Sequence, residues 1–198
     1  MKTPRMTTAV QGGLGVVLLA LLMLPPLQHA LEASMSLHML VQYPALMLAG
    51  ALLGAALPKT IRARLSAWNA LGISGLVACV LFLAVLMIPR VLDLALVDTR
   101  VEFAKVAALL FSGAVLRPSW RAAGLVVQAF FLGNILPMTI IVGTLYQDSP
   151  LRLCNAYRLD DQQRLGLALL WVAIAIAIAW LLRAVRRLST SVACLPQS

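Results

Sequence analysis

The sequence predicts an all-α bundle of about six transmembrane helices that forms a single domain over residues 1–198. Hydrophobic residues make up 62% of the chain, and its mean hydropathy is +0.93. That composition belongs to an integral membrane protein. The apolar residues form continuous runs, each near the roughly 20 residues that a helix needs to cross about 30 Å of hydrocarbon. The runs do not alternate between apolar and polar residues as barrel strands do, so we expect helices.

The first apolar run, 9–27, ends at Pro25 and Pro26. A cleaved signal peptide is the alternative to a first membrane span. We favour a retained span, because cleavage after Ala30 or Ala33 would leave a large residue at the −3 position. The other spans are expected at 36–57, 69–88, 99–116, 122–146 and 163–182, the fourth being short and polar at its start.

The charged residues predict how the bundle is oriented. Ten of the sixteen basic residues precede span one or follow spans two, four and six: Lys2, Arg5, Lys59, Arg62, Arg64, Arg117, Arg121, Arg183, Arg186 and Arg187. All seven acids fall in the other loops or at the span ends next to them: Glu32, Asp93, Asp98, Glu102, Asp148, Asp160 and Asp161. The positive-inside rule makes the basic side cytoplasmic, with both termini on it. We therefore expect a multi-pass protein of the inner (plasma) membrane.

The start of span two carries the residues that favour a metal site. Met35, His38, Met39 and Gln42 share one face of a helix, at spacings of i, i+3, i+4 and i+7. Two thioethers and an imidazole suit Cu(I), and His29, also on the outer side, is a further candidate ligand. The alternative is that His38 is an interfacial polar residue and that the methionines only fill space.

Other polar candidates lie at the same outer side. Lys105 falls about two turns into span four and needs a partner there; Glu102, at i−3, is the expected one. A structural ion pair is favoured over a ligand or proton role. Asp160 followed by Gln163 forms a capping box that opens span six, which leaves Asp161 and Gln162 free to face the centre of the bundle.

Span five contains Gly133, Asn134 and Pro137. An Asn beside a Gly, one turn from a Pro, predicts a flexible or broken helix of the kind that transporters use. The pair Gly50 and Gly54 in span two predicts close helix packing.

Two stretches resemble the caa-type cytochrome c oxidase assembly factor family, CtaG. One is His38-Met39 at the outer start of a helix, followed by a proline and a glycine-rich run. The other consists of Leu145-Tyr146, then Asp161-Gln162-Gln163, Gly166 and Trp171. The resemblance implies a multi-span protein linked to the assembly or copper supply of haem–copper oxidases. Family members carry a second histidine one turn after His-Met, where this chain has Gln42, and they have about seven spans and a longer chain.

The leading hypothesis is therefore a CtaG-like membrane protein that assists oxidase assembly or copper delivery, with copper held by Met35, His38, Met39 and His29. The expected partner is a haem–copper oxidase subunit or another membrane complex, within a lipid bilayer. A non-catalytic accessory subunit and, less favoured, a small-solute transporter are the alternatives. No enzyme motif is visible, so we expect no catalysis. No basic run is interleaved with aromatics, so we expect no nucleic-acid binding.

Overall fold

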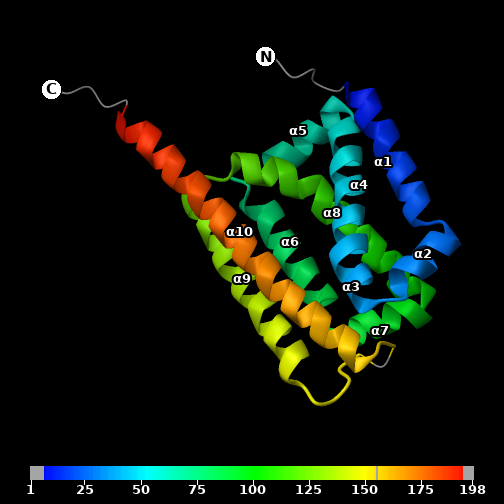
Figure 1. The fold of residues 1–198 in the computed structure, drawn as a ribbon. Coiled ribbons are helices and arrows are strands. Elements are labelled where there is room, and N and C mark those ends of the chain that lie inside the picture. The colour runs from blue at the N-terminus through cyan, green and yellow to red at the C-terminus, as the bar shows by residue number, and fades with distance from the viewer. Residues whose placement is uncertain (1–6, 155, 194–198) are drawn as a thin grey trace.

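The computed structural model describes residues 7–154 and 156–193, and within these ranges it contains helices and connections but no strand (Figure 1). The all-α prediction is confirmed for this part of the chain. In order, the helices are α1 (Thr8–Leu22), α2 (Pro25–Glu32), α3 (Met35–Leu37), η1 (His38–Gln42), α4 (Tyr43–Ala56), α5 (Lys59–Trp68), α6 (Ile73–Leu86), α7 (Pro89–Val97), α8 (Thr99–Ala122), α9 (Leu125–Asp148) and α10 (Leu159–Ala193).

Three helices in the described ranges are long and apolar enough to cross a membrane: Met35–Ala56, Leu125–Asp148 and Leu159–Ser189. The number rises to five if each of two bent helix pairs counts as one span. Six spans were expected, and α8 is the expected span that is missing from this count. It is 24 residues long, but Glu102 and Lys105 near its start and Arg117 and Arg121 near its end lower its hydropathy.

The expected first span, 9–27, is not one straight helix. α1 ends at Leu22, and α2 begins at Pro25 after a bend of 70°. Proline favours the first turn of a new helix and disfavours a helical conformation at the residue before it; Leu24 is accordingly extended. The chain thus turns here, and α2 packs across the end of the bundle instead of continuing the span.

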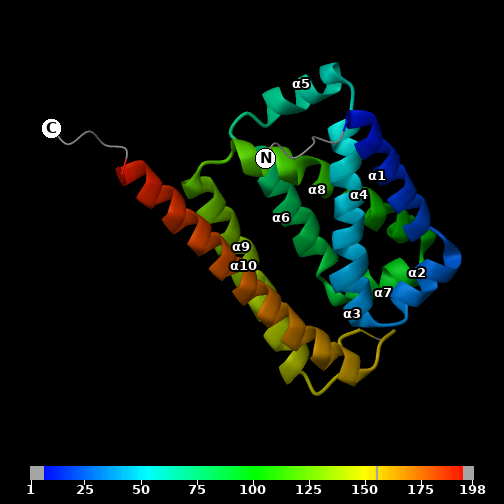
Figure 2. The same ribbon diagram turned by 45° about the horizontal axis from the view of Figure 1, so that its top comes forward.

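The expected third span, 69–88, begins later than predicted, because α5 and α6 meet at a bend of 86°. Gly72 stands at the bend with a φ of 76°, which only glycine adopts readily. The Asn69 side chain fixes the corner: it donates to Ser119 Oγ at 2.7 Å and accepts from the Gly75 N–H at 2.9 Å. The bend lays α5 across the end of the bundle that holds the C-terminal end of α8 (Figure 2).

Helix α4 packs against α8 on one side and α1 on the other. Contact with α8 is backbone to backbone, because a Cβ atom on Gly50 would overlap Leu110 and one on Gly113 would overlap the Met47 carbonyl. Gly54 similarly faces Ala114. The close packing predicted from Gly50 and Gly54 is confirmed.

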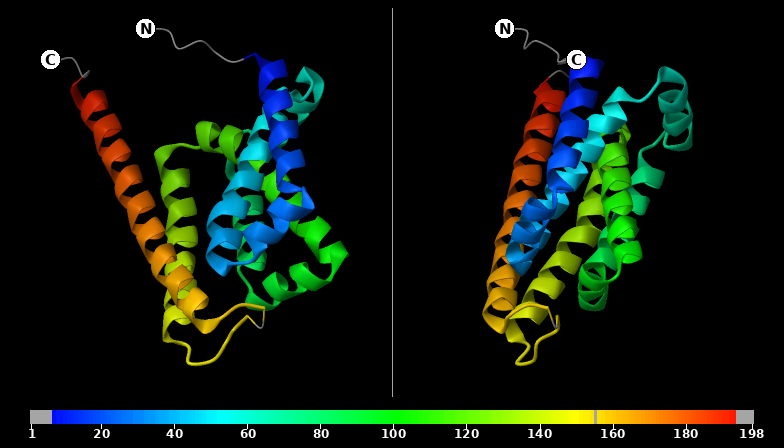
Figure 3. Two further views of the ribbon diagram at one scale, coloured as in Figure 1. Left: turned by 45° about the vertical axis from the view of Figure 1, so that its right-hand side comes forward. Right: turned by 90° about the vertical axis from the view of Figure 1, so that its right-hand side faces the viewer.

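Helices α9 and α10 form a hairpin that stands to one side of the other helices (Figures 2 and 3). It meets them where α10 contacts α3 and where α9 contacts α6. The break expected around Pro137 is absent, since α9 is continuous from Leu125 to Asp148.

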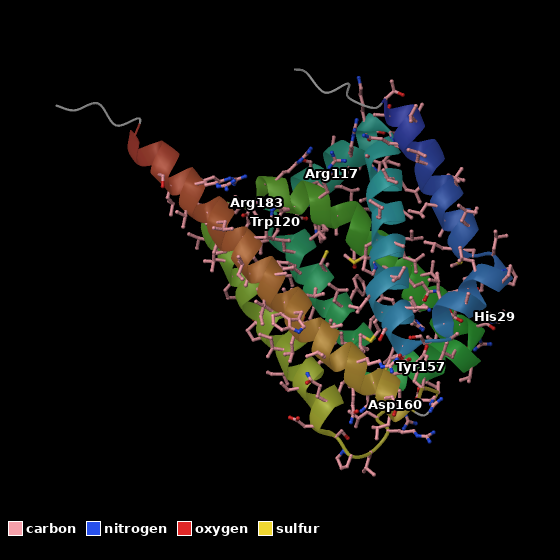
Figure 4. The ribbon with its side chains drawn as sticks, viewed as in Figure 1. His29, Arg117, Trp120, Tyr157, Asp160 and Arg183 are labelled. Atoms are coloured by element: carbon pink, nitrogen blue, oxygen red, sulfur yellow. The ribbon has the colours of Figure 1, made fainter. Side chains whose placement is uncertain are left out.

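The two ends of the molecule carry different charges. Arg117 and Arg183 lie toward one end, and Asp160 lies at the other (Figure 4). The remaining basic residues of the predicted cytoplasmic set follow the same division through α5 and the C-terminal ends of α8 and α10, except that Lys2 and Arg5 lie outside the described residues. We call these two ends the basic end and the acidic end.

Candidate functional site

A buried polar cluster lies at the acidic end, where α2, η1 and α8 meet the loop before α10. Its centre consists of His38, Gln42 and Lys105, whose exposed fractions are 0%, 0% and 1%. Buried polar groups are costly unless they are paired, and Lys105 is a charged group on an apolar helix. The contacts of these three side chains therefore decide what the cluster can do.

The π-helical turn η1 positions His38 and Gln42. The Tyr43 N–H donates to the His38 carbonyl, five residues earlier, so the turn holds one residue more than an α-helical turn. Pro44 follows at once and has no N–H to continue the regular pattern. The wide turn buries His38, Met39 and Gln42 together, and π turns of this kind occur often at functional sites.

Lys105 is the hub of the cluster. Its ammonium lies 2.6 Å from Glu102 Oε2 and 3.5 Å from Glu32 Oε1. The contact with Glu102 is the shorter of the two ion pairs. The same ammonium lies 3.4 Å from Gln42 Oε1 and 3.2 Å from His38 Nε2. The expected Glu102–Lys105 pair is present, but it belongs to a larger network.

Two amide side chains hold the carboxylates in place. Gln28 Nε2 lies 3.2 Å from both Glu32 Oε1 and Glu102 Oε1. Gln42 Nε2 donates to Glu32 Oε1 at 3.3 Å. The network thus joins two carboxylates to one ammonium, so its formal charge is −2 + 1 = −1 when these three groups are ionised and His38 is neutral. A single added positive charge would neutralise it.

The contacts of His38 determine which ring nitrogen carries the proton. An ammonium can only donate, so Nε2 accepts from Lys105. The proton therefore resides on Nδ1, which donates to the Tyr157 hydroxyl at 2.8 Å. The free electron pair of the imidazole is then on Nε2, and it points at Lys105.

Asp161 and Gln162 both face inward, as the sequence suggested, but at separate places. Asp161 accepts from Ser34 Oγ at 2.9 Å and from the Met35 N–H, and so joins the start of α10 to the start of α3. Gln162 is buried, accepts from the Leu153 N–H and donates to the Tyr146 carbonyl. Both residues hold the α9–α10 loop against the cluster.

The predicted capping box at Asp160 is wrong. Helix α10 begins at Leu159, which puts Asp160 in the first turn instead of at the cap. Its carboxylate pairs with the exposed Arg158 at 3.6 Å. An acid in the first turn still interacts favourably with the helix dipole, which is why the sequence signal resembled a cap.

The structure separates the proposed copper ligands into two groups. Met35 and Met39 are buried in the core beside His38. His29 lies on the exposed side of α2, whereas the Tyr157 partner of His38 lies toward α3 (Figure 4). No group of three or more His, Cys, Asp or Glu side chains that could hold a metal ion occurs among the described residues.

Three members of the cluster were not predicted from the sequence as part of it: Gln28, Glu32 and Tyr157. Gln28 and Glu32 stand at i and i+4, so they share one face of the short helix α2, and that spacing was a usable signal. Tyr157 lies in the loop before α10, 119 residues from His38. Nothing local in the sequence marks it.

Two groups in that loop have pKa values shifted by burial. Burial, and after it the charge of Glu32, raises the pKa of the Tyr157 hydroxyl, so it stays protonated at physiological pH. Burial also raises the pKa of Cys154 to about 12, and its thiol lies 3.7 Å from the Pro89 carbonyl. Cys154 is thus a buried, protonated thiol packed in the loop.

No protein-family model, curated protein or solved structure matches the chain. The cluster offers a lone pair on His38 Nε2 and one surplus negative charge, and Met35 and Met39 are buried in the adjoining core.

Proposed function

We propose that the chain crosses the inner membrane six times, with the basic end in the cytoplasm. The three long apolar helices supply three crossings, and each bent pair supplies one more, through α1 and α6. Helix α8 supplies the sixth: its charged residues Glu102 and Lys105 pair inside the cluster and do not face lipid. The division of charge between the two ends supports this orientation. The buried cluster then lies at the outer face.

We propose further that the protein assists the assembly of a haem–copper oxidase by carrying Cu(I) at this outer cluster. Two things support the proposal: the resemblance of the His38-Met39 and Asp161-Gln162-Gln163 stretches to the CtaG family, and the surplus negative charge beside soft donors. A monovalent soft cation balances that charge and suits an imidazole and two thioethers. In this proposal copper is cargo, and the chain acts as a carrier, not a catalyst.

Met35, His38 and Met39 are the proposed ligands, and His29 is left out because it lies on the exposed side of α2. Lys105 occupies the side of His38 Nε2 from which a metal would bind. Copper therefore has to displace the ammonium, which keeps Glu102, Glu32 and Gln42 as partners. The Nδ1–H to Tyr157 bond fixes the ring in the tautomer that metal binding requires.

The test is an anaerobic titration of the purified protein with Cu(I) against a competing chelator. Met35→Leu/Met39→Leu removes both sulfurs and keeps the volume of the core. We expect it to weaken binding at least about tenfold, the scale on which metal sites respond to changed ligands or supports. The matched control is His29→Ala, which should bind copper as the wild type does.

Equal copper binding by the wild type and the double variant would show that these methionines carry no copper. Failure of the wild type to compete with the chelator at all would overturn the carrier proposal. A stoichiometric partner that co-purifies from native membranes without copper would instead favour the accessory-subunit alternative.

A further inference from the structure

A second candidate site lies at the basic end, away from the cluster. It is a cleft of about 570 Å³ between α1, α4, α5 and α8, which we call the basic cleft. Four cationic side chains line it, Lys59, Arg62, Arg117 and Arg121, together with polar groups that include Gln11. None of the seven acidic side chains of the chain lines the basic cleft.

These four cations are unneutralised by any acid in the described part of the chain. The ion pairs that Lys105 and Arg158 form both belong to the acidic end. Arg62 donates to the Ala55 carbonyl at 3.3 Å, which leaves its charge uncompensated. Four like charges around one cleft repel each other, and an anion bound between them relieves that repulsion.

A second cleft of about 790 Å³ continues from the first. It runs between α4, α6 and α8 on one side and the α9–α10 hairpin on the other, and we call it the apolar cleft. Most of its lining is aliphatic or aromatic, such as Met47, Leu83, Leu136 and Ile176. Ala51, Arg117 and Arg121 line both clefts, so the charged and apolar spaces adjoin. Both volumes fall in the roughly 300–1,000 Å³ range of ligand sites.

Trp120 marks the junction of the two spaces. It lines the apolar cleft, and its ring meets Phe131 edge to face at 6.0 Å. Gln128 donates to the Trp120 carbonyl and accepts from Trp180 Nε1 at 3.2 Å, so α8, α9 and α10 are joined here. Arg117 and Trp120 lie toward the same end of the bundle (Figure 4). Tryptophan at the boundary of polar and apolar space is typical of a membrane interface.

We propose that the two clefts form one binding site for an anionic phospholipid. The phosphate of the headgroup binds Arg117 and Arg121, with Lys59 and Arg62 beside them, and an acyl chain lies in the apolar cleft. Charge complementarity identifies the headgroup, because arginine pairs with phosphate through two parallel hydrogen bonds. The adjoining apolar space distinguishes a lipid from a soluble phosphate. Basic pockets between membrane helices bind lipid headgroups in this way.

The test is a titration of the purified full-length protein in detergent micelles, with bound lipid counted by native mass spectrometry. The probes are phosphatidylglycerol and phosphatidylcholine with the same acyl chains. We expect the wild type to retain phosphatidylglycerol in preference to phosphatidylcholine. Arg117→Gln/Arg121→Gln should lower the phosphatidylglycerol affinity about 30-fold. The control Arg64→Gln/Arg183→Gln removes two exposed charges that line neither cleft, and should leave the affinity unchanged.

A third variant tests the apolar cleft separately from the charge. Ala51→Phe fills the space where the two clefts join and should weaken phosphatidylglycerol binding while all four cations remain. Glycerol 3-phosphate, which has the phosphate but no acyl chains, should not displace the lipid. Equal binding of the two lipids, equal losses in the two arginine pairs, or displacement by glycerol 3-phosphate would each overturn the proposal.

Discussion

At the scale of the residue, Lys105 decides how the acidic end is built. A buried ammonium is tolerated only when it is paired and hydrogen-bonded, and Lys105 has two carboxylates, an amide oxygen and an imidazole nitrogen around it. Those partners come from α2 and η1, which are close together in the sequence, and from α8, which is distant from both. One side chain thereby joins three helices at a place where apolar packing alone would not specify their positions.

Replacing Lys105 with Met should destabilise the protein by about 3–5 kcal/mol, the usual cost of breaking a buried charge pair. The variant leaves Glu32 and Glu102 close together with no cation between them. The measurement is the midpoint of thermal unfolding in detergent micelles. Arg100→Met, at an exposed position on the same helix, should change stability by less than about 0.5 kcal/mol. Similar midpoints for the two variants would contradict the hub role of Lys105.

Residue spacing in the sequence predicted some members of this cluster but not the others. Met35, His38, Met39 and Gln42 share a helical face, and the spacing of residues along a helix predicts which of them share a face. Glu102 was assigned to Lys105 from the i, i+3 rule. The i, i+4 spacing of Gln28 and Glu32 on α2 was a local signal that was not used. Tyr157 joins the cluster through a contact between elements far apart in the sequence, and local pattern carries no information about such a contact.

At the scale of the element, small residues set how closely α4 and α8 approach. Gly50 and Gly113 each face the backbone of the other helix. This contact holds η1 and the start of α8 at the distance at which Lys105 reaches His38. The sequence predicted the packing from Gly50 and Gly54, but the partner residue Gly113 became visible only in the structure.

Gly113→Ala should destabilise the protein by about 1–3 kcal/mol, because the added methyl group overlaps the Met47 carbonyl and the helices must separate. Gly133→Ala is the matched control: it lies in α9, where an added Cβ meets nothing within 4 Å. Alanine suits a helix better than glycine, so this control should be neutral or slightly stabilising. Thermal unfolding of both variants measures the difference, and equal effects would argue against the close contact.

Element boundaries were predicted less well than element type. The long apolar runs became helices, but Pro25 and Gly72 introduced bends of 70° and 86° that divided two expected spans. The hydropathy of a run reports its total apolar content, whereas a bend depends on a few backbone positions. Pro137 shows the opposite case, since α9 continues through it.

At the scale of the whole molecule, one end has an excess of basic residues, the other end holds all the acids together with a similar number of basic residues, and apolar surface covers the sides. Composition and the loop pattern predicted this arrangement. Large exposed side chains such as Phe103, Val126, Phe130 and Trp171 lie on the outside of the helices, as lipid-facing residues do.

The proposed six-span arrangement predicts where reporter enzymes become active. Alkaline phosphatase, which folds only outside the cytoplasm, should be active when fused after Val97 or Ser149 and inactive when fused after Pro58 or Ala123. Green fluorescent protein fusions at the same positions should give the inverse pattern. The fusions after Val97 and after Ala123 flank α8 and therefore test it directly. If alkaline phosphatase were active at both positions, or inactive at both, α8 would not cross the membrane.

The separation of charge also has an electrical consequence. In a membrane that is negative inside, each positive charge moved across the full potential costs about 2.3 kcal/mol per 100 mV. The basic end carries eight such residues in the described chain: Lys59, Arg62, Arg64, Arg117, Arg121, Arg183, Arg186 and Arg187. If the basic end lies in the cytoplasm as proposed, an energised membrane acts on this protein as on an oriented dipole and opposes its inversion after insertion.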